Sequence, residues 1–302
     1  MAPEGNRPVR GSGVNPGGFL RKVLTQKSRE IEAASKMLSL DALRARLATA
    51  PPPRDFARAL RAAFRPANSL AVGSNGPSGF PRPAIIAEYK RASPSRGVIR
   101  TDLGAAEVAQ MAEAAGAAAL SVLTDREFFQ GDPQFLREAR AACGLPILRK
   151  DFIIDPYQVY EARYLGADAV LLIAAAVTPE RLAMLVRLTN ALGMTPLVEV
   201  HNAMELAAAL AAKAAVVGIN NRNLDTLAVD LAVTESLAPI CPGDVLVVSE
   251  SGIRTRADVE RVTRAGAKAI LVGEAVMSGG VGAAIRELLG DAAPGHTEGE
   301  PV

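Results

Sequence analysis

Cysteine and histidine are scarce in this chain. Its 302 residues include two cysteines, Cys143 and Cys241, which lie far apart and form no Cys-x-x-Cys motif. We therefore expect reduced thiols in a cytoplasmic protein rather than a disulfide framework. The two histidines are His201 and His296. This number excludes a metal site built from several histidines and argues against a histidine-based triad, so we expect no metal.

Aromatic residues and net charge are also low. Only 4% of the residues are aromatic, the formal net charge is +2, and the basic residues are scattered. This composition argues against nucleic acid or a membrane surface as a partner. No apolar segment reaches transmembrane length, and residues 1–18 contain no run of signal-peptide type. What is abundant is apolar residues, at 49%, which predicts a well-buried core.

Short apolar runs alternate with segments of helical pattern from residue 84 onward. Eight such runs start near Ala84, Ala118, Pro146, Asp168, Pro196, Ala215, Val245 and Ala269. Their mean spacing of about 26 residues suits one strand and one helix with the loops between them. Continuous apolar stretches such as 170–173 and 245–248 are typical of parallel strands that are buried on both faces.

An internal repeat favours a closed arrangement of these units. Gly116, Gly166 and Gly266 each end a helical segment before a strand, at intervals of 50 and 100 residues. These intervals correspond to about two and four βα units, so we predict an α/β protein with a single (β/α)8 TIM barrel. A doubly wound open sheet is the alternative. The even repeat and the lack of a Gly-x-Gly-x-x-Gly motif favour the barrel.

Composition divides the chain into four predicted segments. They are a disordered leader (1–18), a helical N-terminal extension that packs on the barrel (19–82), the catalytic barrel (83–290) and a disordered tail (291–302). The extension has two open interpretations. It could cover the barrel mouth and exclude water, or it could plug the opposite end or mediate assembly.

Polar residues end most of the predicted strands, although the strand bodies are apolar. Glu88 and Lys90 end the first strand, Lys150 the third, Glu199 the fifth and Asn220 the sixth. The carboxyl ends of the strands of such a barrel meet at one mouth, and period-2 alternation places these residues on one face. Each alone would suggest an ion pair at a strand end. Together they predict convergence on one cavity, where ammonium and carboxylate groups can serve as acid and base.

Glycines follow the last two strands. Gly252 comes after the seventh strand, and Gly273 and Glu274 come after the eighth. Backbone N–H groups in this position bind phosphate in many barrels, and two ordinary tight turns are the alternative. The carboxylate of Glu274 is unfavourable beside a phosphate, but its N–H can donate if the side chain points away. Ser93 and Ser95 after the first strand could close the same pocket.

The strand endings resemble those of the indole-3-glycerol phosphate synthase family over roughly residues 19–290. Six ordered motifs carry the resemblance: IAEYKRASPS at 86–95, SVLTD at 121–125 with FQG at 129–131, LRKDF at 148–152, LVEVH at 197–201, GINNR at 218–222 and SESGI at 249–253. The neighbouring phosphoribosylanthranilate isomerase family lacks the Glu-Tyr-Lys and Lys-Asp-Phe strands. The resemblance implies ring closure of 1-(2-carboxyphenylamino)-1-deoxyribulose 5-phosphate with loss of carbon dioxide and water, in tryptophan biosynthesis and without a cofactor.

The resemblance also implies residue roles. Lys150 is the acid for ring closure, held by carboxylates such as Glu88, and Glu199 is the base for dehydration. Lys90 and Lys150 remain alternatives for the dehydration acid, and Asn220 orients a hydroxyl. The implied substrate-binding residues are Ser93, Phe129, Phe152, Leu172, Arg222, Glu250 and Ser251, and the implied phosphate-binding residues are Gly252, Gly273 and Glu274. Leu172 could equally be ordinary core.

A protein of a different class is the alternative to an enzyme. A non-catalytic barrel that binds a sugar phosphate would keep the phosphate glycines but need not keep Glu88, Lys90, Lys150 and Glu199 together. We expect a phosphorylated small molecule as the binding partner, with no nucleic acid and no membrane, and a monomer or weak homo-oligomer.

Overall fold

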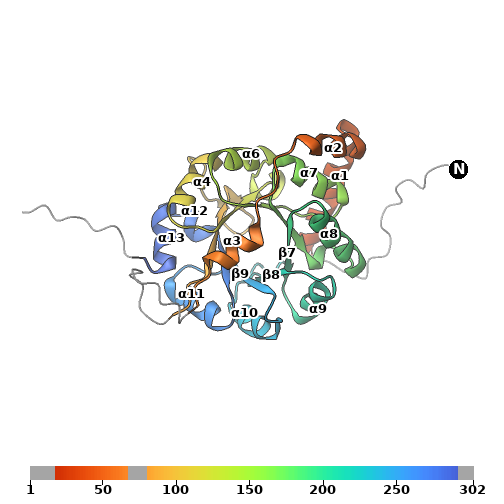
Figure 1. Cartoon of the computed structure of the whole chain (residues 1–302). Helices are drawn as coiled ribbons and strands as arrows, with labels where there is room; N and C mark the ends of the chain where they lie inside the picture. The colour runs from red at the N-terminus through yellow and green to blue at the C-terminus, as the bar shows by residue number, and fades with distance from the viewer. Residues whose placement is uncertain (1–17, 67–79, 292–302) are drawn as a thin grey trace, which may run out of the picture.

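Eight parallel strands close into a barrel in the computed structural model, which describes residues 18–66 and 80–291 (Figure 1). The strand order around the barrel is β1-β10-β9-β8-β7-β6-β5-β4. Their bounds are β1 (Ala84–Tyr89), β4 (Ala119–Leu123), β5 (Ile147–Lys150), β6 (Ala169–Ile173), β7 (Thr195–Val200), β8 (Val216–Asn220), β9 (Leu246–Glu250) and β10 (Ala269–Val272). Each strand begins within one residue of its predicted start. The (β/α)8 prediction is confirmed, because β1 pairs with β10 and leaves no open edge.

Helices follow the strands and pack outside them. They are α4 (Ala105–Ala114), α5 (Arg126–Phe129), α6 (Pro133–Ala142), α7 (Pro156–Leu165), α8 (Pro179–Ala191), α9 (Ala203–Ala211), α10 (Ala232–Leu237), α11 (Arg256–Arg264), α12 (Glu274–Met277) and α13 (Val281–Leu289). Three 3₁₀ turns are η1 (Leu47–Thr49), η2 (Ala174–Ala176) and η3 (Ala238–Ile240), and β2 (Ala92–Ser93) pairs with β3 (Gly97–Val98) in a small hairpin after β1. Asp132 and Asp155 cap α6 and α7 ahead of a proline, which needs no hydrogen-bond partner at the first helical position.

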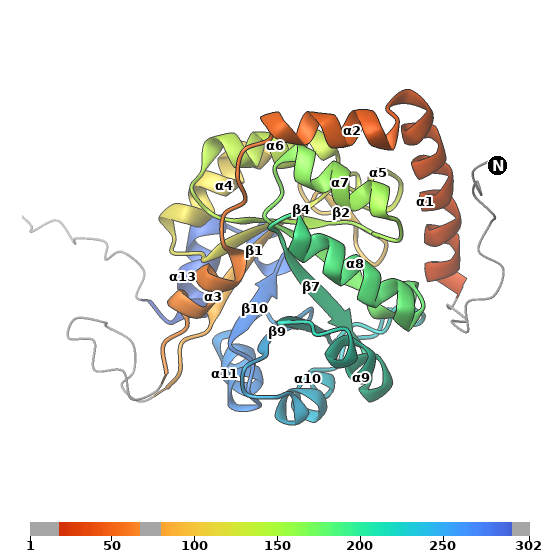
Figure 2. The same ribbon diagram turned by 45° about the vertical axis from the view of Figure 1, so that its right-hand side comes forward.

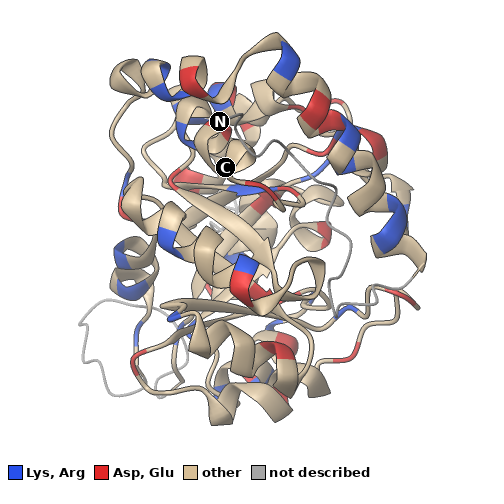
Figure 3. Ribbon diagram, turned by 90° about the vertical axis from the view of Figure 1, so that its right-hand side faces the viewer, with Lys and Arg blue, Asp and Glu red and all other residues tan. Residues whose placement is uncertain are grey.

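Alternation along the strands separates two apolar cores. Ala84 and Ile86 of β1 belong to the inner core of the barrel, whereas Ile85 and Ala87 belong to the outer core between strands and helices. Acidic and basic residues are interspersed along the surrounding helices in the view of Figure 3. Among the described residues, no helix is both long and apolar enough to cross a membrane.

The N-terminal extension contacts both ends of the barrel. It consists of α1 (Gly18–Met37), α2 (Leu40–Arg46) and α3 (Phe56–Ala63) (Figure 2). Leu20 and Val23 of α1 pack with Phe152, beyond the carboxyl end of β5. Phe56 and Leu60 of α3 are fully buried among the first residues of the strands, so α3 plugs the amino-terminal end. The extension therefore supplies a mouth cover and a plug from different helices.

Asp168 connects the N-terminal extension to the amino-terminal end of the barrel. This fully buried carboxylate lies just before β6 and accepts hydrogen bonds from the backbone N–H groups of Arg54 and Ile147, at 2.5 Å and 2.7 Å. It also pairs with the guanidinium of Arg140. Because every one of these donors would be left unpaired without it, Asp168 ties the segment between α2 and α3 to β5 and α6.

The predicted disordered leader and tail lie outside the described residues except at their inner ends. Gly18, assigned to the leader, is instead the first residue of α1. Asp291, assigned to the tail, pairs with Arg82 at 2.8 Å. Residues 67–79 of the predicted N-terminal extension also lie outside the described part of the chain, and Arg65 and Arg82 on either side of them form an antiparallel bridge.

The plug generates a prediction about stability. Replacing Phe56 with alanine (Phe56→Ala) should lower the free energy of unfolding by about 3–5 kcal/mol, because it leaves a cavity in the inner core. The control is Met204→Ala, whose side chain is 80% exposed and whose loss should cost no more than about 0.5 kcal/mol. Urea denaturation followed by circular dichroism measures both. Equal losses in the two variants would contradict the plug assignment.

Candidate active site

The inward side chains at the carboxyl end of the barrel include one complete charged layer. Glu88 of β1 pairs with Ser121 of β4, and Ser121 pairs with Leu148 of β5, which is two residues before Lys150. In the same way, Glu199 of β7 pairs with Gly218 of β8, and Gly218 pairs with Val248 of β9, which is two residues before Glu250. This gain of two residues for every two strands is the stagger of a barrel with a shear of about eight, in which alternate strands fill one layer. Glu88, Lys150, Glu199 and Glu250 therefore lie at one level.

Lys150 is the only cation of that layer, and three carboxylates surround it. Its Nζ forms an ion pair with Glu250 and lies 3.7 Å from Glu199 Oε2 and 3.9 Å from Glu88 Oε2. Burial alone would lower the pKa of Lys150, but the charges of Glu250, Glu88 and Glu199 outweigh it and raise the pKa. The ammonium is therefore protonated at neutral pH. Glu88 is one of the carboxylates around Lys150, as the sequence led us to expect, and Glu250 is nearer to the ammonium than Glu88 is.

Glu88 is engaged mainly with Lys90. The two side chains form an ion pair of 2.7 Å at the edge of the pocket. Burial would raise the pKa of Glu88, but Lys90 and then Lys150 outweigh it, so the pKa is lowered. Gly273 on β10's end makes room for this pair, because a Cβ there would overlap Glu88 Oε1 and lie 3.1 Å from Lys90 Nζ.

Glu199 has a histidine behind it that the sequence did not single out as a site residue. Glu199 Oε1 lies 3.4 Å from His201 Nε2, and His201 Nδ1 lies 3.0 Å from Glu205. Burial lowers the pKa of His201, but its contacts with the two carboxylates outweigh burial and raise the pKa to about 10. The pKa of Glu199 is lowered, because His201, Lys150 and the amide of Asn220 outweigh its burial. The strand alternation 197–199–201 was the available signal for His201.

Glu250 is the least compensated carboxylate of the layer. Its Oε2 binds Lys150, while its buried Oε1 has no hydrogen-bond partner. Burial raises the pKa of Glu250, and the neighbouring Glu199 adds to this, although Lys150 opposes both. Gly218 on β8 is required beside it, because a Cβ there would overlap Glu250 Oε1 and lie 2.7 Å from Leu197 Cδ2.

A pocket opens above this layer. Its apolar walls include Phe19 of α1, Phe129 and Phe152, and the rings of Phe129 and Phe152 lie 6.2 Å apart. The structure places the following residues from the sequence prediction in its lining: Glu88, Lys90, Ser93, Phe129, Lys150, Phe152, Glu199, Asn220, Arg222, Ser251, Gly252, Gly273 and Glu274. Glu250 lies beneath the lining in contact with Lys150.

Leu172 is the wrong choice for an apolar wall. It is fully buried in the outer core, against the helices. Its neighbours Leu171 and Ile173 point inward and line the pocket instead. The continuous apolar run of β6 gives no signal of which residues point inward, so the face was misassigned by one residue.

The opposite wall of the pocket is made by tight turns. Ser251 and Gly252 adopt positive φ values of 65° and 83°, and a Cβ at Gly252 would lie 2.5 Å from Val229 Cγ1. The carboxylate of Glu274 pairs with Arg96 and, at 3.1 Å, with Arg254. These arginines engage the Glu274 side chain that would otherwise repel an anion at this end.

The fold and the charged layer place this chain among the (β/α)8 barrels that carry ionisable side chains at the carboxyl end of the sheet. Residues 20–288 match the family model described as indole-3-glycerol phosphate synthase. A protein of that name from Chromobacterium violaceum is 50% identical over 259 residues, which cover 86% of this chain and 92% of that protein. One from Azoarcus sp. is 47% identical over 275 residues, with 90% and 99% covered. The chain belongs to the indole-3-glycerol phosphate synthase family.

Solved structures of low sequence identity share the fold. An N-acetylmannosamine-6-phosphate 2-epimerase from Clostridium perfringens has a TM-score of 0.52 at 17% identity, with 65% of this chain and 88% of that chain covered. A thiamine phosphate pyrophosphorylase from Pyrococcus furiosus has a TM-score of 0.52 at 18% identity, with 68% and 93% covered. These similarities concern the barrel architecture alone.

The raised pKa of Glu250 predicts that a neutral side chain at this position stabilises the fold, by an amount that depends on pH. The protonated carboxyl is stabilising below its ordinary pKa of 4.5, and this contribution is lost as pH rises through the raised pKa. Glu250→Gln, which imitates the protonated form, should therefore raise the free energy of unfolding more at about pH 8 than at about pH 5.

Denaturant titrations at the two pH values measure this difference. The exposed Glu287→Gln serves as the control and should show no such dependence. An equal effect of Glu250→Gln at both pH values would contradict the titration of Glu250 as the cause.

Proposed function

We propose that this chain closes the indole ring of indole-3-glycerol phosphate, using 1-(2-carboxyphenylamino)-1-deoxyribulose 5-phosphate and releasing carbon dioxide and water. The observation that carries the proposal is the ammonium of Lys150, which is half-buried, is held by carboxylates, has a raised pKa and lines a pocket with aromatic walls. Family membership supports the same reaction.

The two ends of the pocket suit the two ends of this substrate. Phe19, Phe129 and Phe152 supply an apolar region for the anthranilate ring. Gly252 and Gly273, with Ser93 across from them, supply backbone and hydroxyl donors for the phosphate. Arg222 lines the pocket as well and is the proposed partner of the substrate carboxylate. Asn220 is the proposed partner of a hydroxyl.

Ring closure needs an acid. An aromatic carbon of the substrate attacks the carbonyl carbon, the carbonyl π electrons move to oxygen, and Lys150 transfers a proton to that oxygen. A developing alkoxide is far more basic than an amine, so an ammonium with a raised pKa still donates to it. The substrate carboxylate then leaves as carbon dioxide, and the electron pair of the broken bond restores the aromatic ring.

Dehydration needs an acid and a base. The hydroxyl group leaves as water after it takes a proton from an ammonium group, either Lys90 or Lys150. Glu199 accepts the proton that the new ring loses as its double bond forms. The lowered pKa of Glu199 keeps the carboxylate ionised at neutral pH, which is the form that accepts a proton, and it also makes Glu199 a weaker base than an isolated glutamate.

A cytoplasmic location and a monomer or weak homo-oligomer remain proposals as well. The location is supported by Cys143 and Cys241, neither of which forms a disulfide.

The proposal of activity is tested by supplying the carboxyphenylamino deoxyribulose phosphate to the purified protein and following the appearance of indole fluorescence. Binding without fluorescence would favour the non-catalytic sugar-phosphate barrel.

Removing the proposed acid should abolish turnover. Lys150→Ala should lower kcat by at least about 10²–10⁴-fold, because the proton donor for ring closure is lost. The fold should persist, since Glu88 keeps Lys90 and Glu199 keeps His201 as partners, while Glu250 can take up a proton. Indole fluorescence measures turnover and circular dichroism measures folding, with the exposed Lys36→Met as the control. An active Lys150→Ala variant would contradict the role of Lys150 as the acid for ring closure.

Replacing the proposed base should lower the turnover rate without weakening substrate binding. Glu199→Gln should lower kcat by at least about 10²-fold, because glutamine accepts no proton, and should leave KM nearly unchanged. Steady-state kinetics measures both constants, and single-turnover experiments show whether dehydration is the slowed step. An unchanged kcat with a raised KM would show that Glu199 binds the substrate and does not act as the base.

A further inference from the structure

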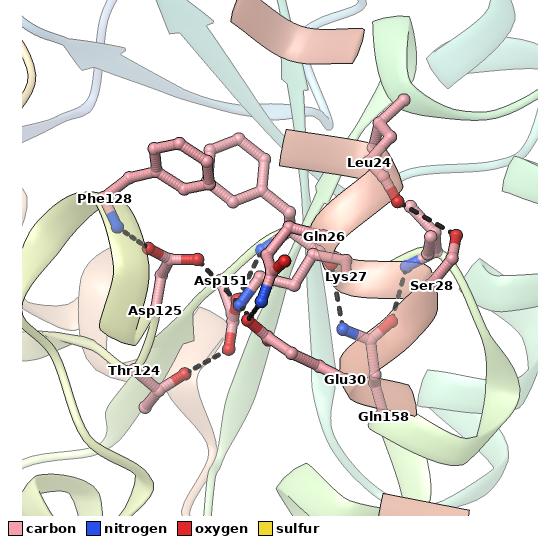
Figure 4. A network of polar contacts seen from close by, with 12 residues as sticks. Leu24, Gln26, Lys27, Ser28, Glu30, Thr124, Asp125, Phe128, Asp151 and Gln158 are labelled. Carbon is pink, nitrogen blue, oxygen red and sulfur yellow. Dashed lines mark hydrogen bonds and ion pairs between the residues drawn. The ribbon is translucent and has the colours of Figure 1, made fainter. Parts of the chain in front are cut away.

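Lys27 of α1 is a buried lysine that is not part of the charged layer. Only 2% of the residue is exposed, and its ammonium forms ion pairs with Asp125 at 2.7 Å and Asp151 at 2.9 Å (Figure 4). Glu30, one turn further along α1, lies 2.8 Å away. The two aspartates come from different loops at the barrel mouth, after β4 and after β5. One ammonium therefore joins the extension to two active-site loops.

Asp151 is fixed on every side. It directly follows Lys150 and precedes Phe152, whose backbone N–H donates to it at 2.8 Å. Its other oxygen accepts from Thr124 Oγ1 at 2.6 Å and from Arg149 at 3.2 Å. Burial would raise the pKa of Asp151, but Arg149 and Lys27 outweigh it and hold the pKa at about 2. Asp151, the residue next to Lys150, is thus held in place by Lys27 together with Arg149 and Thr124.

Asp125 depends on Lys27 more completely. Its Oδ1 caps α5 by accepting from the backbone N–H of Phe128 at 2.7 Å, while its Oδ2 is paired with Lys27. Helix α5 carries Phe129 into the pocket lining. The ring of Phe128 meets Phe19 of α1 edge to face, with centroids 5.5 Å apart. Asp125 and the two rings therefore lock α5 and α1 together.

We propose that Lys27 is a positioning residue that locks α1 onto the barrel and thereby holds the aromatic end of the active site in shape. It acts through Asp151 on Lys150 and through Asp125 on Phe129, and it keeps Phe19 in the pocket wall. The proposal rests on the proposed function, since it assigns the region near α1 to the aromatic ring of the substrate. The phosphate end, at Gly252 and Gly273, has no contact with this cluster in the interactions described above.

The first test compares Lys27→Met with Lys36→Met on the same helix. Methionine keeps the apolar stem and removes the ammonium, and Lys36 is exposed with a single surface partner, Glu32. Lys27→Met should lower kcat/KM at least about tenfold, as expected when reacting groups are displaced by a fraction of an ångström. It should weaken binding of indole-3-glycerol phosphate while leaving the affinity for inorganic phosphate within about twofold of the wild type.

A double variant distinguishes positioning from stability. Lys27→Met leaves Asp125 as a buried carboxylate without a cation, which destabilises the fold. Adding Asp125→Asn removes that charge while keeping a capping oxygen for α5. We expect the double variant to recover the urea midpoint but not kcat/KM. It also carries the test if Lys27→Met alone does not fold.

The outcomes separate the two proposals. Full recovery of kcat/KM together with stability in the double variant would overturn the positioning role, and so would wild-type kinetics in Lys27→Met. Equal weakening of product and inorganic phosphate would overturn the assignment of Lys27 to the aromatic end. Failure of the wild-type protein to form indole would instead count against the proposed function.

Discussion

The burial of one ammonium among three carboxylates is the interaction on which the mouth of this barrel depends. The shear of the barrel places Glu88, Lys150, Glu199 and Glu250 in a single layer, and the closed sheet beneath leaves them no access to water except through the pocket. Such a layer is tolerable only while the charges compensate one another. That requirement explains Gly218 and Gly273, which make room for carboxylate oxygens, and it explains why Lys150 remains protonated.

The fold was largely predictable because its signals are local and repeated. Each strand was a short apolar run between helix starts and glycine-ended helices, and parity placed Glu88, Lys150 and Glu199 on inward faces. The alternation of inward and outward residues did not place Leu172 correctly, because a strand that is apolar on both faces gives no sequence signal of which face points inward. The cluster around Lys27 was not predictable, because a lysine in a helix normally indicates a solvated surface. Its partners, Asp125 and Asp151, lie about a hundred residues away and share no local pattern with it.

Buried aspartates attach the extension at both ends of the barrel, Asp168 through the backbone N–H of Arg54 and Asp151 through the ammonium of Lys27. Asp168 at the lower end and Asp151 at the mouth each accept a backbone N–H of the barrel and each bind a cation from outside the sheet. A buried carboxylate of this kind is stable only when all its partners are present. The extension is therefore an integral part of the barrel rather than an appendage. α3 completes the inner core, and α1 completes the wall of the pocket.

His201 lies behind the charged layer and stabilises the ionised form of Glu199. Glu88, Glu199 and Glu250 are three carboxylates, while Lys90 and Lys150 are two ammonium groups in contact with them. With all of these groups ionised, the base of the pocket carries one excess negative charge, which Glu250 removes when it takes up a proton at its raised pKa. His201, whose pKa is raised to about 10 beside Glu199 and Glu205, supplies a further positive charge at neutral pH. The carboxylate of Glu205, on the other side of the imidazole, offsets this charge, so the contribution of His201 is to keep Glu199, the proposed base, ionised.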